Sequence, residues 1–126
     1  AVHLRPDAAR FEAGNPGLLS AFVLENALCT LASFTREAIL EHALQLGDAL
    51  IEGLRARGRT IITPADPKER AGNICFLAAD APALAQRLAD QDVLVWGSEG
   101  RVRVSAHLYN DLADLDRFFA ALDAAG

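Results

Sequence analysis

Residues 101–119 read RVRVSAHLYNDLADLDRFF, and this stretch says most about the fold class. Its first five residues, RVRVS, alternate between polar and apolar side chains. A period of two residues is typical of a strand with one face in the core and the other in solvent. The stretch therefore begins as a predicted strand that presents Arg101 and Arg103 on its polar face.

The same stretch then changes to the pattern of a helix. Asp111 is a favourable N-cap residue, and Asp114 follows three residues later in the first turn. Apolar side chains recur beyond it at helical spacing, namely Leu112, Leu115, Phe118, Phe119 and Leu122. A strand that leads into a capped helix delivers a cation at a fixed place on the edge of the strand. Such an arginine is suited to binding a carboxylate through two parallel hydrogen bonds.

The rest of the chain predicts further helices and strands. Helices are expected over residues 18–34, between Thr35 and Gly58, and from Pro82 onward, and strands over 60–62, 73–78 and 93–96. A polar loop covers 64–72, and the short connection 97–100, GSEG, suits a hairpin. We therefore expect an α+β fold, with a small mixed or antiparallel sheet of about four strands and helices packed on one face.

The segment 18–34 is almost continuously apolar. This pattern predicts a helix that is buried on most sides and needs a covering surface, within this domain or on another one. Cys29 and Cys75 also lie in apolar segments and lack the CxxC spacing of a metal site. We expect both to be buried free thiols in a protein of a reducing compartment, the cytoplasm.

Length and composition narrow the classes of function. The 126 residues are enough for one domain but few for a self-sufficient cofactor enzyme. A formal charge of −5 and scattered arginines argue against nucleic-acid binding. No apolar run approaches the roughly 20 residues of a membrane span, so no membrane partner is expected. Methionine is absent, also at position 1, so we expect the chain to begin inside a longer protein.

Two motifs carry a resemblance to a known family. The first is R-V-S at residues 103–105, followed by Y-N at 109–110 and an acidic helix start, and the second is RFEAGNP at residues 10–16. Their order and separation resemble those of class V aminotransferase-fold enzymes, a pyridoxal-phosphate group that includes cysteine desulfurases, selenocysteine lyases, kynureninases and epimerases. The resemblance implies the small domain of aminotransferase fold type I. Residues 1–16 would be an extended lead-in from a large domain, and 17–126 the small C-terminal domain.

The resemblance also implies roles for individual residues. Arg103 matches the arginine that binds the substrate α-carboxylate in this family, and His107 lies in the turn that follows it. Asn15 matches a Thr or Asn position that contacts the cofactor phosphate across a dimer interface, which makes a homodimer the expected assembly. From the residues alone other roles stay open, because Arg103 could pair with Asp111 or Asp114, and Asn15 could cap the helix that follows it.

Several neighbours of these motifs are expected to have structural roles. Arg101 is predicted to be a solvated charge, and His42 a packed or capping histidine. Trp96 is expected in the core or in an interface. Tyr109 and Asn110 are expected to stabilise the turn between the last strand and the last helix.

Two absences limit what the chain is expected to do. Its one lysine, Lys68, lies in the polar loop, whereas these enzymes need a Schiff-base lysine for pyridoxal 5′-phosphate. We therefore expect no catalytic residue and no metal site in this chain. In addition, Trp96 connects to Arg101 through GSEG alone, without the cysteine-bearing loop of the desulfurases. This argues against desulfuration by a thiol, and Cys75, inside a strand, is no substitute.

The leading hypothesis is therefore a C-terminal domain of a pyridoxal-phosphate enzyme that acts on an amino acid, as a transaminase, lyase or epimerase. The domain would contribute the carboxylate-binding arginine and interface contacts, and the isolated chain would be inactive. A non-catalytic interaction module with the same fold is the alternative. A regulatory amino-acid-binding domain is a third, weaker reading that rests on fold analogy alone.

Overall fold

The computed structural model of the chain describes residues 3, 5–11, 14–15 and 17–126. It divides into two compact units, residues 1–35 and 36–126. The sequence-based boundary between residues 16 and 17 concerned a large domain outside this chain, and it stays a prediction. Pro16, Glu12 and Ala13 of the predicted motif lie outside the described residues.

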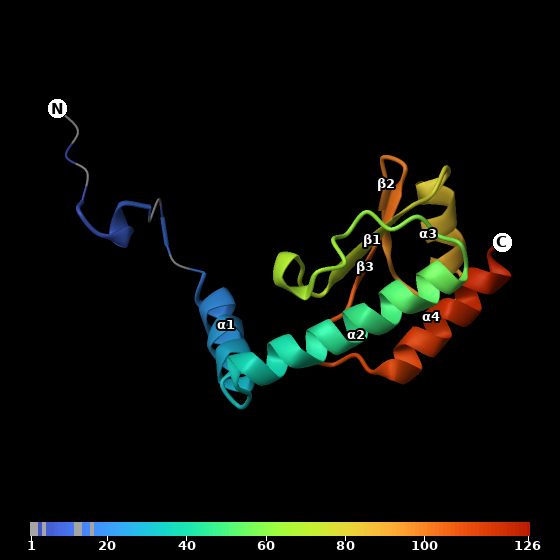
Figure 1. Cartoon of the computed structure of the whole chain (residues 1–126). Helices are drawn as coiled ribbons and strands as arrows, with labels where there is room; N and C mark the ends of the chain where they lie inside the picture. The colour runs from blue at the N-terminus through green and yellow to red at the C-terminus, as the bar shows by residue number, and fades with distance from the viewer. Residues whose placement is uncertain (1–2, 4, 12–13, 16) are drawn as a thin grey trace. The chain divides into compact units, whose positions relative to one another are not determined.

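The first unit contains a short 3-10 helix, Ala8–Phe11, and helix α1, Leu18–Leu31 (Figure 1). The predicted helix is confirmed, although Gly17 at its N-cap supplies no side-chain hydrogen bond. None of its residues is buried in this chain, and its large apolar side chains face solvent. The first unit by itself therefore does not cover this helix, and whether its covering surface lies within this domain or on another one stays a prediction. The expected burial of Cys29 is wrong, because Cys29 is exposed.

The second unit is an α+β domain with one core (Figure 1). Its elements are α2 (Arg36–Ala56), a 3-10 helix η2 (Pro67–Glu69), β1 (Asn73–Leu77), α3 (Ala81–Ala89), β2 (Trp96–Ser98), β3 (Arg101–Ser105) and α4 (Leu112–Ala124). The strands form an antiparallel sheet in the order β1-β3-β2. The predicted fold class is confirmed.

The sheet has three strands rather than four, because the segment predicted over 60–62 pairs only through a bridge between Ile61 and Phe76. The strand predicted over 93–96 is shifted, since its ladder with β3 begins at Ser98 and ends at Trp96. Glu99 and Gly100, at φ of 52° and 72°, form the two-residue loop of this hairpin. Positive φ at both loop positions is the geometry of a type I′ turn, which sets the register from the turn outward.

The ends of the two long helices follow from the local sequence. At the end of α2, Gly58 adopts φ 67°, Gly58 N–H donates to the Arg55 carbonyl (2.9 Å), and Arg59 N–H donates to the Leu54 carbonyl (3.0 Å). This is a Schellman motif, for which glycine is favoured. At the start of α4, Asp111 and Asp114 form a reciprocal capping box, as predicted for the N-cap.

The core lies between the helices and one face of the sheet. Helix α2 packs against β1 and α4, while α3 packs against β2. Strand residues Ile74, Phe76 and Val102 are fully buried on this side. The helices contribute their apolar stripes, namely Leu46, Leu50, Ile51 and Leu54 from α2, Ala81, Leu84 and Leu88 from α3, and Leu115, Phe118, Ala121 and Leu122 from α4. The predicted packing on one face is therefore confirmed, and the other face of the sheet is left open.

Candidate functional site on the open face of the sheet

The open face carries the polar side chains of β3. Arg101, Arg103 and Ser105 are exposed, whereas Val102 is buried and Val104 half-buried. The two-residue alternation predicted from the sequence is therefore present in the strand. In the register of the sheet, Arg103 lies between Cys75 of β1 and Trp96 of β2.

Arg103 contacts an aromatic ring. Its guanidinium carbon lies 5.4 Å from the centre of the Trp96 ring, within the range of a cation–π contact. Neither Asp111 nor Asp114, the two acids considered from the sequence, forms an ion pair with it, and within residues 3, 5–11, 14–15 and 17–126 it has no carboxylate partner.

Arg101 has a different environment on the same face. Its Nη2 donates to Glu99 Oε2 at 2.8 Å, and its guanidinium lies 5.7 Å from the centre of the Trp96 ring. Glu99 belongs to the hairpin loop, so the tight turn places an acid next to Arg101. Of the two arginines on this strand, Arg103 is the one whose hydrogen-bond donors are not already engaged by an acid in the described structure.

The sequence did not predict the role of Trp96. Trp96 is 41 % exposed and belongs to the open face, not to the core. The expectation of a core position is wrong, while an interface position stays a prediction. The sequence could have predicted this position, because pairing the residues outward from a two-residue loop at Glu99 and Gly100 places Trp96 opposite Arg103.

The turn after β3 is organised around Asn110. The Asn110 Oδ1 accepts from the His107 backbone N–H (2.9 Å), and its Nδ2 donates to Asp114 Oδ2 (3.0 Å). His42 Nε2 of α2 bonds to the Asn110 carbonyl oxygen at 2.9 Å. These contacts confirm the predicted turn role of Asn110, and they place His42 in a structural position.

His107 and Tyr109 lie on the outside of this turn. Their rings stack with centroids 5.0 Å apart, and both side chains are exposed, Tyr109 by 77 %. Tyr109 therefore stacks in the turn without being packed in the core. A ligand-binding role for His107 stays a prediction.

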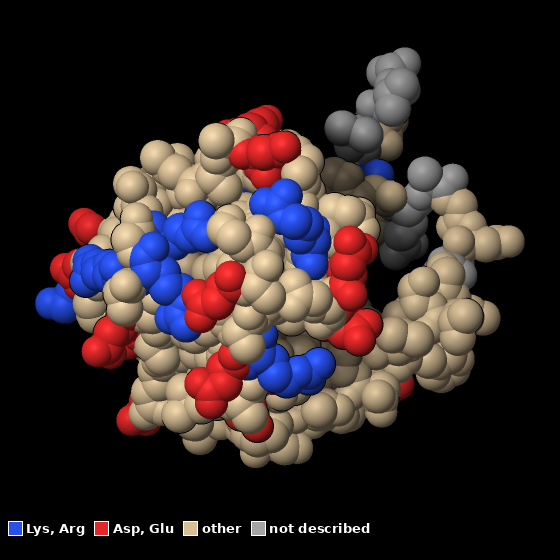
Figure 2. Space-filling model, turned by 90° about the vertical axis from the view of Figure 1, so that its right-hand side faces the viewer, with Lys and Arg blue, Asp and Glu red and all other residues tan. Residues whose placement is uncertain are grey.

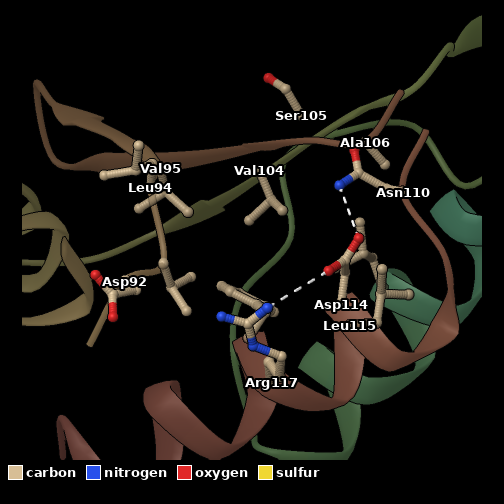
Figure 3. Close-up of a pocket in the computed structure, with 13 residues that line it drawn as sticks. Asp92, Leu94, Val95, Val104, Ser105, Ala106, Asn110, Asp114, Leu115 and Arg117 are labelled. Carbon is tan, nitrogen blue, oxygen red and sulfur yellow. Dashed lines mark hydrogen bonds and ion pairs between the residues drawn. The ribbon is translucent and has the colours of Figure 1, made fainter. Parts of the chain in front are cut away.

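A small pocket opens beside the same turn (Figure 3). It has a volume of about 150 Å³ and lies where residues 93–95 are no longer paired with β3. Three of its polar side chains interact with one another: Asp114 accepts from Asn110, and Arg117 lies 3.9 Å from Asp114 (Figure 3). The hydrogen bond from Asn110, and next the one from the Asp111 backbone, lowers the pKa of the Asp114 carboxyl. Because these groups already have partners, the open sheet face is the better candidate site.

The remaining predicted site residue, Asn15, is exposed in the first unit. Lys68 is exposed on the 3-10 helix η2, and its surroundings do not desolvate an amine. The described residues include no buried carboxylate that would bind a pyridine nitrogen, and no group of three His, Cys, Asp or Glu that could bind a metal ion. Among the described residues, those that the sequence singled out are Arg103, His107 and Asn15, and their proposed roles toward a cofactor or substrate stay predictions.

Known proteins resemble this chain in sequence and in fold. The sequence model of the kynureninase C-terminal domain family matches residues 39–122. The chain belongs to this family. It is 32% identical over 132 residues to a probable cysteine desulfurase of Pseudomonas putida, and 32% identical over 120 residues to an uncharacterized aminotransferase of Schizosaccharomyces pombe. The alignments cover 94% and 92% of this chain but 33% and 30% of those proteins.

A solved structure shows the same fold. The apo structure of a cysteine desulfurase from Thermococcus onnurineus superposes with a TM-score of 0.83 at 24% identity, over 93% of this chain and 33% of that one. The chain spans about a third of the length of the curated relatives it matches. It is the C-terminal domain of a class V aminotransferase-fold enzyme, as the two motifs indicated.

Proposed function

We propose that this domain supplies the carboxylate-binding part of a pyridoxal-phosphate enzyme that acts on an amino acid. The observation that carries the proposal is the contrast on β3: Arg101 is paired with Glu99, whereas the Arg103 guanidinium has no acidic partner among the described residues. A planar guanidinium with free N–H donors can bind a carboxylate through two parallel hydrogen bonds.

The cofactor would be bound by a part of the enzyme outside this chain. Pyridoxal phosphate supplies the electron sink for amino-acid chemistry, so the protein's task is to bind and orient the substrate. In the proposed homodimer, Asn15 would reach the cofactor phosphate of the neighbouring subunit and His107 would lie near the substrate. The isolated chain would be inactive. Unpaired Cys29 and Cys75 support a cytoplasmic location.

The reaction we propose is a transamination, a lyase reaction or an epimerisation rather than sulfur transfer by a thiol. The loop between β2 and β3 consists of Glu99 and Gly100 alone, so it contains no cysteine that could move toward a substrate. Cys75 lies within β1, where its backbone N–H donates to Thr63 Oγ1 at 2.8 Å. A strand residue fixed in this way cannot swing toward a substrate.

The test is the Michaelis constant of the complete enzyme for the amino acid it turns over fastest in a screen of the standard amino acids. Arg103→Ala should raise this constant about tenfold to a hundredfold, because a charge-assisted contact to the substrate is lost. Arg101→Ala, on the same face of the same strand, is the matched control and should raise it less than about threefold. Equal effects of the two changes would contradict the assignment of Arg103.

The exposed apolar surface of α1 fits the proposed enzyme domain and also one alternative, a non-catalytic interaction module. Leu19, Phe22 and Val23 are each more than half exposed in this chain, so a second surface must cover them. An enzyme domain and an interaction module both require such a surface. The two alternatives differ in amino-acid turnover. The native protein turns over an amino acid if the domain belongs to an enzyme, and it does not if the domain is an interaction module.

A further inference from the structure

We infer that Trp96 is the positioning residue for Arg103. The inference rests on the proposed function, since it concerns how the same arginine meets the substrate carboxylate. Three observations support it: the cross-strand register, the stacking distance, and the position of Glu99 in the hairpin loop.

The register places the two side chains together. Trp96 and Arg103 are directly opposite on neighbouring antiparallel strands and share the open face. Side chains at opposite positions start about 5 Å apart, so the indole and the guanidinium meet without a special conformation of either strand. The contact depends on the type I′ turn, because a one-residue shift of the hairpin would move Trp96 to the helix side.

The contact with Trp96 leaves the N–H donors of the Arg103 guanidinium free. The Arg103 guanidinium carbon lies over the Trp96 ring at 5.4 Å from its centre. A contact through the face of the ring uses none of the five N–H donors of the guanidinium. Arginine has a flexible side chain whose ordering opposes binding, and a flat partner that orders it beforehand favours the bound geometry.

Trp96 lies near two arginines, Arg101 and Arg103, but only Arg101 is bonded to Glu99. The Arg101 guanidinium also lies near the ring, at 5.7 Å, yet it donates to Glu99 at 2.8 Å. The ring therefore contacts one arginine that is engaged by an acid and one that is not. Of the two arginines of β3, Arg103 is thus the one available for a carboxylate in the described structure.

Substrate kinetics of the complete enzyme test the inference. Trp96→Ala should raise the Michaelis constant for the amino acid about threefold to fivefold with little change in kcat, because the loss is one of binding. Trp96→Phe should restore most of the affinity, since it keeps an aromatic face. In an Arg103→Ala background, Trp96→Ala should have no further effect, because the residue acts through Arg103.

Each outcome has a separate meaning. If Arg103→Ala raises the Michaelis constant and Trp96→Ala does not, the positioning role is overturned and the proposed function stands. The same holds if Trp96→Ala acts equally with and without Arg103. If Arg103→Ala itself has no effect, the proposed function fails and the positioning role with it.

A spectroscopic measurement on this chain does not depend on turnover. Trp96 is its one tryptophan, so its fluorescence reports the contact directly. Removing the stacked guanidinium by Arg103→Ala should make the ring more accessible to acrylamide quenching than in the unchanged chain. An unchanged quenching constant would overturn the stacking, and with it the inference.

Discussion

The two faces of the three-stranded sheet are built from alternate residues of the same strands, but their surroundings differ. On the helix side, Phe76 and Val102 are fully buried, and Gly97 follows in the same row of the register. On the open side, the adjacent row is Cys75, Arg103 and Trp96. One face stabilises the domain, and the other leaves a cation free for a ligand.

The two faces of the sheet therefore have different tasks in this small domain. The side chains on the helix side pack against three helices, so a change there affects the free energy of unfolding. The open side contributes little to the core, so it can carry charged residues without destabilising the fold. Changes on the two faces should therefore separate into stability effects and binding effects.

The largest stability effect is expected on the helix side. Phe76→Ala removes a fully buried ring and should lower the free energy of unfolding by about 3–5 kcal/mol. Leu77→Ala is the control from the next position of β1, where the side chain is 49 % exposed, and should change it by less than about 1 kcal/mol. Urea denaturation followed by circular dichroism measures both. Similar losses at the two positions would contradict the assignment of the faces.

A smaller loss is expected from Gly97→Ala. A Cβ at this position would overlap the Ala81 carbonyl oxygen and crowd the Ala85 Cβ of α3. Because backbone atoms cannot rotate away, we expect a loss of about 1–3 kcal/mol in the free energy of unfolding. Ser98→Ala, the next residue of β2, should change it by less than about 0.5 kcal/mol. A neutral Gly97→Ala would show that α3 does not pack closely on the sheet.

The smallest effect is expected at the surface of the helical layer. Arg57, the residue after α2, donates to both carboxylate oxygens of Asp123 in α4, at 2.6 and 2.8 Å, and this hydrogen bonding lowers the pKa of Asp123. A carboxyl whose pKa is lower in the folded state stabilises the fold above its unfolded pKa of about 3.9, and the contribution is lost as the pH falls through its folded pKa.

The urea midpoint of Asp123→Asn should therefore lie slightly below that of the unchanged chain at about pH 7, and the difference should vanish at about pH 2. Asp116→Asn, on the same helix and without an ion pair in the described part of the chain, is the control and should show no such pH dependence. A difference between Asp123→Asn and the unchanged chain that persists in acid would contradict the ion-pair account.

Much of the fold could be predicted because its signals are local. The alternation in β3, the capping box at Asp111 and the glycine after α2 each determine their element within a few residues. The strand predicted over 93–96 is shifted to Trp96–Ser98 because a run of apolar residues does not specify pairing. The hairpin loop fixes the register, the ladder ends at Trp96, and residues 93–95 line the pocket instead (Figure 3).

The sequence could not show which surface covers α1. An apolar pattern indicates that a helix needs a covering surface, but it does not indicate where that surface lies.

On the face shown in Figure 2, basic and acidic side chains are interspersed. Within the described residues no single helix is long and apolar enough to cross a membrane.

The site could be predicted only in part. The position of Arg103 on a polar strand face followed from the sequence, but its separation from Asp111 and Asp114 did not, because both acids are committed to the cap and turn of α4. The contact with Trp96 depends on the register, and the pairing of Arg101 with Glu99 depends on the shape of the loop. Both are properties of the folded hairpin.

The most direct test of the central claim, that this domain works within a pyridoxal-phosphate enzyme, is the intact mass of the native polypeptide from its source. Visible absorbance is followed on the same chromatographic peak. We predict a polypeptide of about three times the mass of this chain, as the covered share of its relatives indicates, with the absorbance of protein-bound pyridoxal phosphate. A colourless native polypeptide of this size would contradict the enzymatic account and favour the interaction module.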